Sequence, residues 1–328
     1  MKHNTRRLAL WAALLILAGA APFLALLPGG GQAASQPPAA TARPSPTAAA
    51  TTAPTPAAAQ TVTVYDEALG KDRLLSVEAF MVGAAACEMP PDWPDAALQA
   101  QMVASRSYAQ AQSQPMTVNS AQCSGWTEES VLKLRWGDDF EATYARLQAL
   151  AAQVSGAVLL YDGAPAAACY HAASCGHTEA SQNVWLTALP YLQGVDSPWD
   201  RTAPDFEVTV EYTAPQLSDA VASLTGAIPQ GDAAGWLGDT VWDAAGYVQS
   251  ITIAGQKLTG SEVRGALGLR SACFSMAWDG AVFTVTTRGY GHGVGLSQYG
   301  AKAMAEGGSG WREILTYYFP GTQVHEAG

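Results

Sequence analysis

Charged residues are scarce in this sequence, and basic residues are the scarcest. Only 14% of the 328 residues are charged, with 17 Lys and Arg against 28 Asp and Glu, which gives a net charge of −11. No acidic residue precedes Asp66, so the negative charge is concentrated in the part of the chain that follows. That part would repel the phosphates of nucleic acids, and no cluster of Lys and Arg offsets the repulsion. We therefore expect no nucleic-acid partner.

Several familiar catalytic motifs are also missing. The segment "GLSQYG" (295–300) approaches the nucleophile elbow G-x-S-x-G, but Tyr299 stands where the second glycine is needed. No register of the surrounding glycines gives G-x-G-x-x-G, and the sequence has no P-loop lysine. The familiar hydrolase and nucleotide-binding signatures therefore do not account for this chain.

The first 29 residues have the pattern of a membrane-insertion segment. The basic start "MKHNTRR" precedes an uncharged apolar run at 8–27. Such a run is long enough to span a bilayer, which predicts a single-pass anchor in the cell membrane with its positive end inside. The small residues of "GQAAS" (31–35) would also suit cleavage of a signal peptide, which would release the chain as a secreted protein. Both alternatives place the body outside the cytoplasm.

A linker separates this segment from the body. Residues 30–60 are rich in Pro, Ala and Thr and contain almost no large apolar residue, so they cannot bury enough surface to fold. Their prolines predict an extended, disordered spacer. From residue 61 to 328 the composition is that of a globular domain.

Mixed secondary structure is expected in that domain. Apolar spacing predicts helices at 77–89 and 95–112, the second with Asp95 as its N-cap. Asp-Gly pairs at 162–163 and 279–280 lie between strand-like segments, the pattern of β-hairpins. Helices and hairpins are grouped rather than alternating, which predicts an α+β fold. We expect one two-lobed domain with a central cleft.

Glu88 and Arg106 form the first candidate site. Glu88 ends the first predicted helix just before Pro90-Pro91, where the chain must turn. Arg106 follows Met102 by four residues and so shares the interior face of the second helix, where a guanidinium needs an anionic partner. A structural ion pair between the two would keep Glu88 ionised and make it a poor acid. In the alternative, Arg106 binds a substrate carboxylate or orients Glu88.

Cysteine and histidine form a second cluster in "ACYHAASCGHTEAS" (168–181). His171, Cys175 and His177 could bind zinc, Cys175 could form a disulfide beside an active-site His171, or Cys and His could form a nucleophilic pair. The spacing lacks the paired ligands of structural zinc modules, so these residues are weak metal candidates. A location outside the cytoplasm favours a disulfide. The five cysteines permit at most two disulfides, and we predict that Cys123 pairs with Cys175.

The stretch "GYGHGVGLSQYGA" (289–301) places His292 among glycines at every second position. Glycines destabilise a strand or helix, so a run of them indicates either an unusual backbone conformation or the close approach of another group. Their backbone amides could approach a sugar or acetamido group, with His292 lining the site. Alternatively, the stretch is a tight strand-to-helix turn packed beneath the site.

Three of these motifs together resemble a known family. They are "EAFMVGAAACEMPPDWPDAALQAQMVASRSYA", "YHAASCGHTEAS" with "YLQGVDSPWD", and "RGYGHGVGLSQYGAKAMAEGGSGWREILTYYFPGT". From about Thr61 to Val324 the chain resembles the stage II sporulation protein D family (SpoIID), grouped with the LytB amidase enhancers. The resemblance implies a lytic transglycosylase that cleaves peptidoglycan glycan strands to 1,6-anhydro-muramic ends, in the wall remodelling of engulfment during sporulation.

The resemblance also implies roles for individual residues. Glu88 falls on the catalytic glutamate, and Arg106 on a functional arginine. The residues expected to contact the substrate are Arg106, His171, Ser174, His292, Gly293, Ser297 and Gln298. Some relatives hold zinc near the second motif, so the resemblance implies an optional structural zinc, and it implies no required cofactor.

A single carboxylate suffices for this reaction because the C6 hydroxyl of the substrate replaces water. Glu88 would protonate the glycosidic oxygen and then take the hydroxyl proton as the anhydro ring closes. Its pKa must be raised, which Met89, Trp93 and their apolar neighbours could do by desolvation. Arg106 should then reach the substrate more than it reaches Glu88. Two alternatives stand: a noncatalytic, glycan-binding enhancer of a separate cell-wall amidase, and a Cys/His amidase that uses Cys175.

Overall fold

The structure is a computed structural model that describes residues 61–326. The predicted anchor (1–29) and linker (30–60) lie outside the described residues. Within the described residues, no helix is both long enough and apolar enough to cross a bilayer. Helices and small sheets are mixed along the chain, which confirms the α+β prediction.

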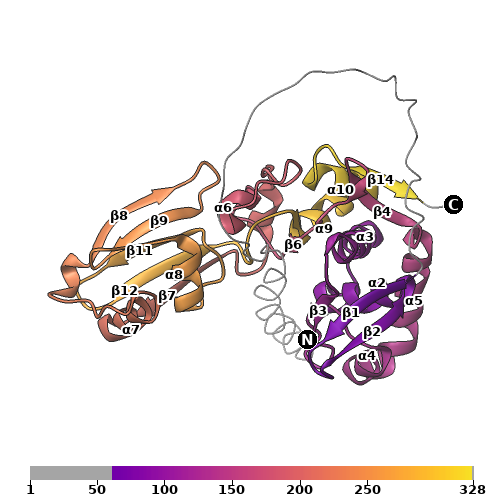
Figure 1. The fold of residues 1–328 in the computed structure, drawn as a ribbon, viewed down its shortest axis with the longest axis horizontal. Coiled ribbons are helices and arrows are strands. Elements are labelled where there is room, and N and C mark those ends of the chain that lie inside the picture. Colours follow the sequence, from indigo (N-terminus) through magenta and orange to yellow (C-terminus); the bar gives the residue numbers. More distant parts are fainter. Residues whose placement is uncertain (1–60, 327–328) are drawn as a thin grey trace, which may run out of the picture.

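The N-terminal part is a small sheet followed by a helical layer (Figure 1). Strand β1 pairs antiparallel with β2 and parallel with β3, and α2 follows β2 directly. The Ser76 side chain accepts a hydrogen bond from the Ala79 amide and so caps the start of α2. The elements are β1 (Thr61–Asp66), β2 (Lys71–Ser76), α2 (Val77–Glu88), α3 (Asp95–Ala111), β3 (Met116–Val118), α4 (Glu129–Trp136), the 3₁₀ turn η2 (Gly137–Asp139) and α5 (Phe140–Val154).

The expected helices of this part are present. Helix α3 begins at Asp95 itself, with Pro94 as the N-cap residue, so the predicted cap was wrong by one position. The face of α3 that carries Leu98, Met102 and Arg106 is buried, as its spacing predicts. Helices α2, α3 and α5 share one hydrophobic core with the β1 strand and the C-terminal helices.

Short strands and helices between residues 157 and 202 connect the N-terminal part to the rest of the fold. Strand β4 turns back into β5 through Asp162-Gly163, both at positive φ, which confirms the first predicted hairpin. The strand after this turn is only two residues long, and His171 lies on the separate strand β6. The elements are β4 (Ala157–Tyr161), β5 (Ala164–Pro165), β6 (Tyr170–His171), α6 (Ser181–Trp185) and η3 (Pro198–Thr202).

Residues from β7 to β12 form a second body with its own hydrophobic core, drawn in orange on the left of Figure 1. It contains the sheets β10-β9-β8 and β11-β12-β7, with α7 and α8 packed together. The β11–β12 hairpin around Asp279-Gly280 confirms the second predicted turn. The elements are β7 (Glu207–Tyr212), α7 (Ala214–Thr225), η4 (Ala233–Gly235), β8 (Leu237–Trp242), β9 (Val248–Ile253), β10 (Gln256–Leu258), α8 (Gly260–Leu267), β11 (Phe274–Trp278) and β12 (Phe283–Arg288).

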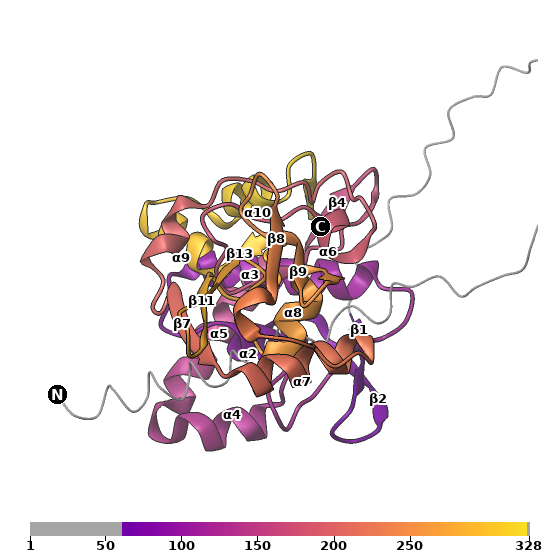
Figure 2. The ribbon, with the colours of Figure 1, turned by 90° about the vertical axis from the view of Figure 1, so that its left-hand side faces the viewer.

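The chain then returns to the first body. Strand β13 pairs in parallel with β6, and β14 pairs antiparallel with β4. Figure 2 shows α9 and α10 in the upper half of the molecule, and both helices pack on α3. Segments from both ends of the described chain (61–326) thus build one core. The elements are β13 (Leu296–Ser297), α9 (Gln298–Glu306), α10 (Trp311–Tyr318) and β14 (Gln323–Glu326).

Candidate active site

Glu88, the last residue of α2, lies inside the first body rather than on its surface. The side chain is 5% exposed. Its carboxyl group is hydrogen-bonded to the backbone amide of Gly125 and to the side chain of Gln298. These partners come from the loop after β3 and from the first residue of α9, so three distant parts of the sequence meet at this carboxyl group.

The environment of Glu88 strongly favours the neutral carboxyl form. Burial raises its pKa from an ordinary 4.5 to about 7, although the hydrogen bonds from Gly125 and Gln298 partly oppose the shift. Met89 and Trp93 are buried in the core of the same body. A carboxyl group with a pKa near neutrality can both donate and accept a proton at the same pH.

This raised pKa predicts a pH-dependent stability. The folded pKa of Glu88 lies above its unfolded value, so its favourable contribution is complete below about pH 4.5 and is lost as the pH rises through 7. Relative to Glu88→Gln, the wild-type chain should lose about 3 kcal/mol of unfolding free energy across this window. Urea titrations of both proteins between pH 4 and 8 measure the difference. A constant difference would show that Glu88 titrates normally.

A series of hydrogen-bonded polar side chains extends from Glu88 along α3. The Gln298 Nε2 atom donates to Gln101 Oε1 at 3.2 Å, and Gln101 Nε2 donates to Ser105 Oγ at 3.0 Å. Ser105 is also hydrogen-bonded to the side chain of Tyr170, whose pKa is raised by burial and by the charge of Glu88. Sequence analysis missed Gln101 and Tyr170 as site residues. Gln101 and Ser105 are polar residues four positions apart on an otherwise apolar face of α3, and this spacing could have indicated a buried polar site.

The predicted disulfide was wrong. Cys123 is bonded to Cys87, whereas Cys175 is a free thiol. The loop after β3 lies along α2, because the indole N–H of Trp126 donates to the carbonyl of Ala79 at 3.2 Å. This packing carries Cys123 to the last turn of α2, and sequence spacing alone did not reveal it. The bond thereby fixes the loop that presents the Gly125 amide to Glu88.

Removal of this disulfide should be costly. We expect the paired variant Cys87→Ser/Cys123→Ser to lose about 3 kcal/mol of unfolding free energy, because the crosslink closes a loop of 36 residues of sequence separation. Denaturant unfolding under non-reducing conditions checks this value. The matched control is Cys169→Ser, which removes a free buried thiol and should leave the Cys87–Cys123 bond intact. Equal losses in both proteins would contradict the expectation.

Arg106 lies in the core of the first body, where its guanidinium contacts backbone carbonyls. Its guanidinium is 1% exposed, and Nη1 donates to the backbone carbonyls of Ser155 and, at 3.1 Å, Ala157. Burial lowers its pKa to about 10, so it stays charged at neutral pH. Arg106 therefore ties α3 to the turn between α5 and β4. The sequence left open whether Arg106 has a structural role or contacts the substrate, and these two carbonyl contacts favour the structural role.

His171 and His292 lie together, 5.7 Å apart between ring centroids, and the Trp185 ring lies 5.0 Å from His292. His171 Nδ1 contacts the carbonyl of Val294 at 3.1 Å, and burial lowers the pKa of its imidazole to about 4. Tyr170, the neighbour of His171 on β6, contacts the Glu88 network. Because successive strand residues point to opposite sides, the histidine pair lies across β6 from Glu88.

Ser174 and Ser297 share a buried carboxylate. Asp200 accepts hydrogen bonds from the Ser174 hydroxyl at 2.5 Å, from the Ser297 hydroxyl at 2.7 Å and from the backbone amide of Ser174 at 2.7 Å. Both hydroxyls are fully buried. The Ser197 side chain is also hydrogen-bonded to the Asp200 carboxyl group. Among the predicted substrate residues, Gln298 is in direct contact with Glu88.

The glycine-rich stretch is a turn packed against the protein itself. All four glycines at 289, 291, 293 and 295 have positive φ. A Cβ atom on Gly295 would lie 2.2 Å from the Cys169 carbonyl oxygen, and one on Gly293 would lie 2.5 Å from the Tyr247 hydroxyl. Side chains are therefore excluded by neighbouring protein atoms, which favours the tight-turn interpretation of this stretch over close approach to a sugar.

The weak zinc candidates do not converge. His171 contacts Val294, His177 Nδ1 contacts the Thr178 carbonyl at 2.7 Å, and Cys175 Sγ contacts the Ala245 carbonyl at 3.1 Å. Residues 61–326 contain no group of three or more His, Cys, Asp or Glu side chains that could hold a metal ion.

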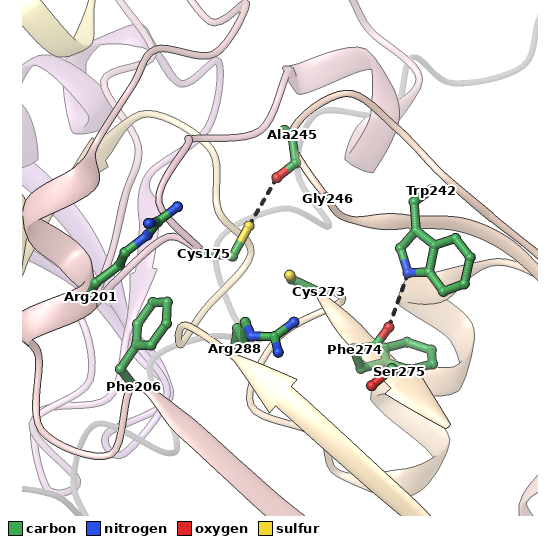
Figure 3. A pocket seen from close by; sticks show the side chains of 10 residues that line it. All are labelled: Cys175, Arg201, Phe206, Trp242, Ala245, Gly246, Cys273, Phe274, Ser275 and Arg288. Atoms are coloured by element: carbon green, nitrogen blue, oxygen red, sulfur yellow. Dashed lines mark hydrogen bonds between the residues drawn. The ribbon is translucent and has the colours of Figure 1, made fainter. Parts of the chain in front are cut away.

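A pocket of about 630 Å³ is lined by residues of the second body and of the segment that leads into it (Figure 3). Its lining includes neither Glu88 nor any predicted substrate residue. The lining residues are Cys175, Arg201, Phe206, Trp242, Ala245, Gly246, Cys273, Phe274, Ser275 and Arg288.

Comparisons with known proteins agree with the motifs. Residues 65–161 match the family SpoIID, described as Stage II sporulation protein. The chain is 32% identical over 278 residues to Stage II sporulation protein D of Bacillus subtilis, which covers 81% of this chain and 79% of that protein. The corresponding protein of Bacillus amyloliquefaciens gives the same identity and coverage. An Amidase enhancer of Bacillus subtilis is 28% identical over 72% of this chain and 39% of its own length.

Proposed function

Because the chain belongs to the stage II sporulation protein D family, we propose that it is a lytic transglycosylase that remodels the peptidoglycan cell wall in sporulation. The observation that carries the proposal is the buried Glu88 carboxyl group, whose pKa is about 7. A structural glutamate at a helix end has no need of such a shift. A group that must act first as an acid and then as a base does.

The proposed reaction needs no second carboxylate and no water. Protonated Glu88 donates its proton to the glycosidic oxygen as the bond from that oxygen to C1 breaks. The carboxylate so formed accepts the proton of the C6 hydroxyl as the C6 oxygen bonds to C1, which closes the 1,6-anhydro ring. The Glu88 carboxyl is thereby regenerated.

The neighbours of Glu88 have distinct roles in this scheme. Gly125 and Gln298 stabilise the carboxylate between the two proton transfers, since both hydrogen bonds lower the pKa. Gln101 holds the Gln298 amide in place, so it is a positioning residue. The proposal requires the glycan to reach the small part of Glu88 that remains exposed.

We also propose that residues 1–29 anchor the chain in the membrane and that the body lies outside the cytoplasm. The Cys87–Cys123 disulfide supports this location, because disulfides persist in oxidising compartments. In this setting the partners are glycan strands and a cell-wall amidase that acts on the same wall.

A noncatalytic role is the second candidate. The similarity to an Amidase enhancer favours it, and so does the 630 Å³ pocket, because Glu88 is not among its lining residues. An enhancer would bind glycan and raise the activity of an amidase without cleaving the strand itself.

Product analysis distinguishes the two candidates. Purified glycan strands, with and without stem peptides, would be incubated with the full-length chain and examined by mass spectrometry. We expect products with 1,6-anhydro-muramic ends. Intact strands together with faster cleavage by an added amidase would support the enhancer instead.

A further inference from the structure

Two free thiols meet at the junction of the two bodies. Cys175 follows β6 in the first body, and Cys273 immediately precedes β11 in the second. Their side chains are within hydrogen-bonding contact of each other. Gly246 packs against both, since a Cβ atom placed on it would lie 3.8 Å from the Cys175 sulfur and 3.9 Å from the Cys273 sulfur.

The pocket described above gives access to this pair. In Figure 3 both sulfur atoms lie at the pocket, with Arg201 and Arg288 on the same side. Cys175 is partly exposed, whereas Cys273 is buried. The charge of Arg288 favours the thiolate form of Cys273, although this guanidinium is also paired with Glu207 at 2.8 Å. Arg201 adds a second positive charge to the pocket lining, which attracts anionic reactants.

We propose that Cys175 and Cys273 are a redox-active pair that closes a second disulfide between the two bodies by reaction with a small anionic disulfide. The Cys175 thiolate attacks the disulfide of the reactant, which forms a mixed disulfide and releases one thiolate. The Cys273 thiolate then attacks Cys175 and releases the second. Two protein thiols are oxidised and one reactant disulfide is reduced to two thiols.

The environment of each sulfur supports this order. The hydrogen bond from Cys273 lowers the pKa of the Cys175 thiol, and the same contact together with burial raises the pKa of Cys273. Cys175 is thus the attacking thiol, and Cys273 resolves the mixed disulfide. The closed disulfide would link the second body to the segment that precedes α6, and it would fix the junction between the two bodies.

The experiment uses the full-length chain and glutathione disulfide as the probe. After incubation, the protein is denatured with an alkylating agent and its mass is measured, followed by peptide mapping without reduction. We expect Cys169 alone to be alkylated and a crosslinked Cys175–Cys273 peptide to appear. Alkylation of all three cysteines that are free in the structure would overturn the proposal. So would a zinc ion that is retained by the pair and blocks oxidation.

Single variants test the order of the two steps. In Cys273→Ser the mixed disulfide cannot be resolved, so a glutathione adduct should accumulate on Cys175. In Cys175→Ser the buried Cys273 should stay unmodified. Equal adduct formation in the two variants would contradict the assigned roles. The number of alkylated cysteines in the wild-type chain is measured without any substitution. That measurement remains decisive if either variant fails to fold.

Discussion

Glu88→Gln should abolish glycan cleavage while leaving the chain folded. Glutamine has the same shape and can still accept the hydrogen bond from the Gly125 amide, but it cannot transfer a proton. Loss of one general acid–base group lowers a rate by about 10²- to 10⁴-fold. The rate of formation of 1,6-anhydro-muramic ends measures the effect, and circular dichroism confirms that the variant is folded.

The matched control is Glu78→Gln. Glu78 lies in the first turn of the same helix and is exposed, so its substitution should change neither the rate nor the stability appreciably. A folded Glu88→Gln protein that cleaves glycan at the wild-type rate would remove Glu88 from the mechanism. Loss of amidase enhancement in the same variant, without any cleavage by the wild type, would favour the noncatalytic role.

Local patterns in the sequence predicted the elements that depend on local interactions. Helices α2 and α3 could be predicted because their apolar residues recur at helical spacing, and the β11–β12 turn because Asp-Gly suits the positive φ of such turns. The pairing of Cys87 with Cys123 depends instead on how the loop after β3 packs against α2. That packing depends on the contact between Trp126 and the α2 backbone, and the spacing of the cysteines carries no information about this contact.

The candidate site shows the same division. The position of Glu88 at a helix end followed from Pro90-Pro91, but its contact with Gln298 arises because α9 packs on α3. Such a long-range contact leaves no periodic trace in the sequence. The roles of Ser174 and Ser297 were equally ambiguous. The sequence does not distinguish a serine that binds Asp200 in the core from a serine that binds a sugar.

Arg106→Ala should be among the most destabilising single substitutions in the first body. It would leave the buried carbonyls of Ser155 and Ala157 without their guanidinium donor, and hydrogen bonds to charged groups contribute about 1.5 to 3 kcal/mol each. We therefore expect a loss of about 3 to 6 kcal/mol of unfolding free energy, measured by urea titration. Cleavage per folded molecule should stay close to the wild-type value.

Arg106→Lys separates this role from substrate binding. An ammonium group can donate to one or both carbonyls but lacks the planar fork of arginine, so we expect an intermediate loss of stability and retained activity in the folded fraction. The opposite result would be wild-type stability with cleavage largely lost. It would mean that the guanidinium acts on the glycan, because Lys would then satisfy the carbonyls of Ser155 and Ala157 but not the substrate. The burial of Arg106 and its two carbonyl contacts lead us to expect the structural outcome.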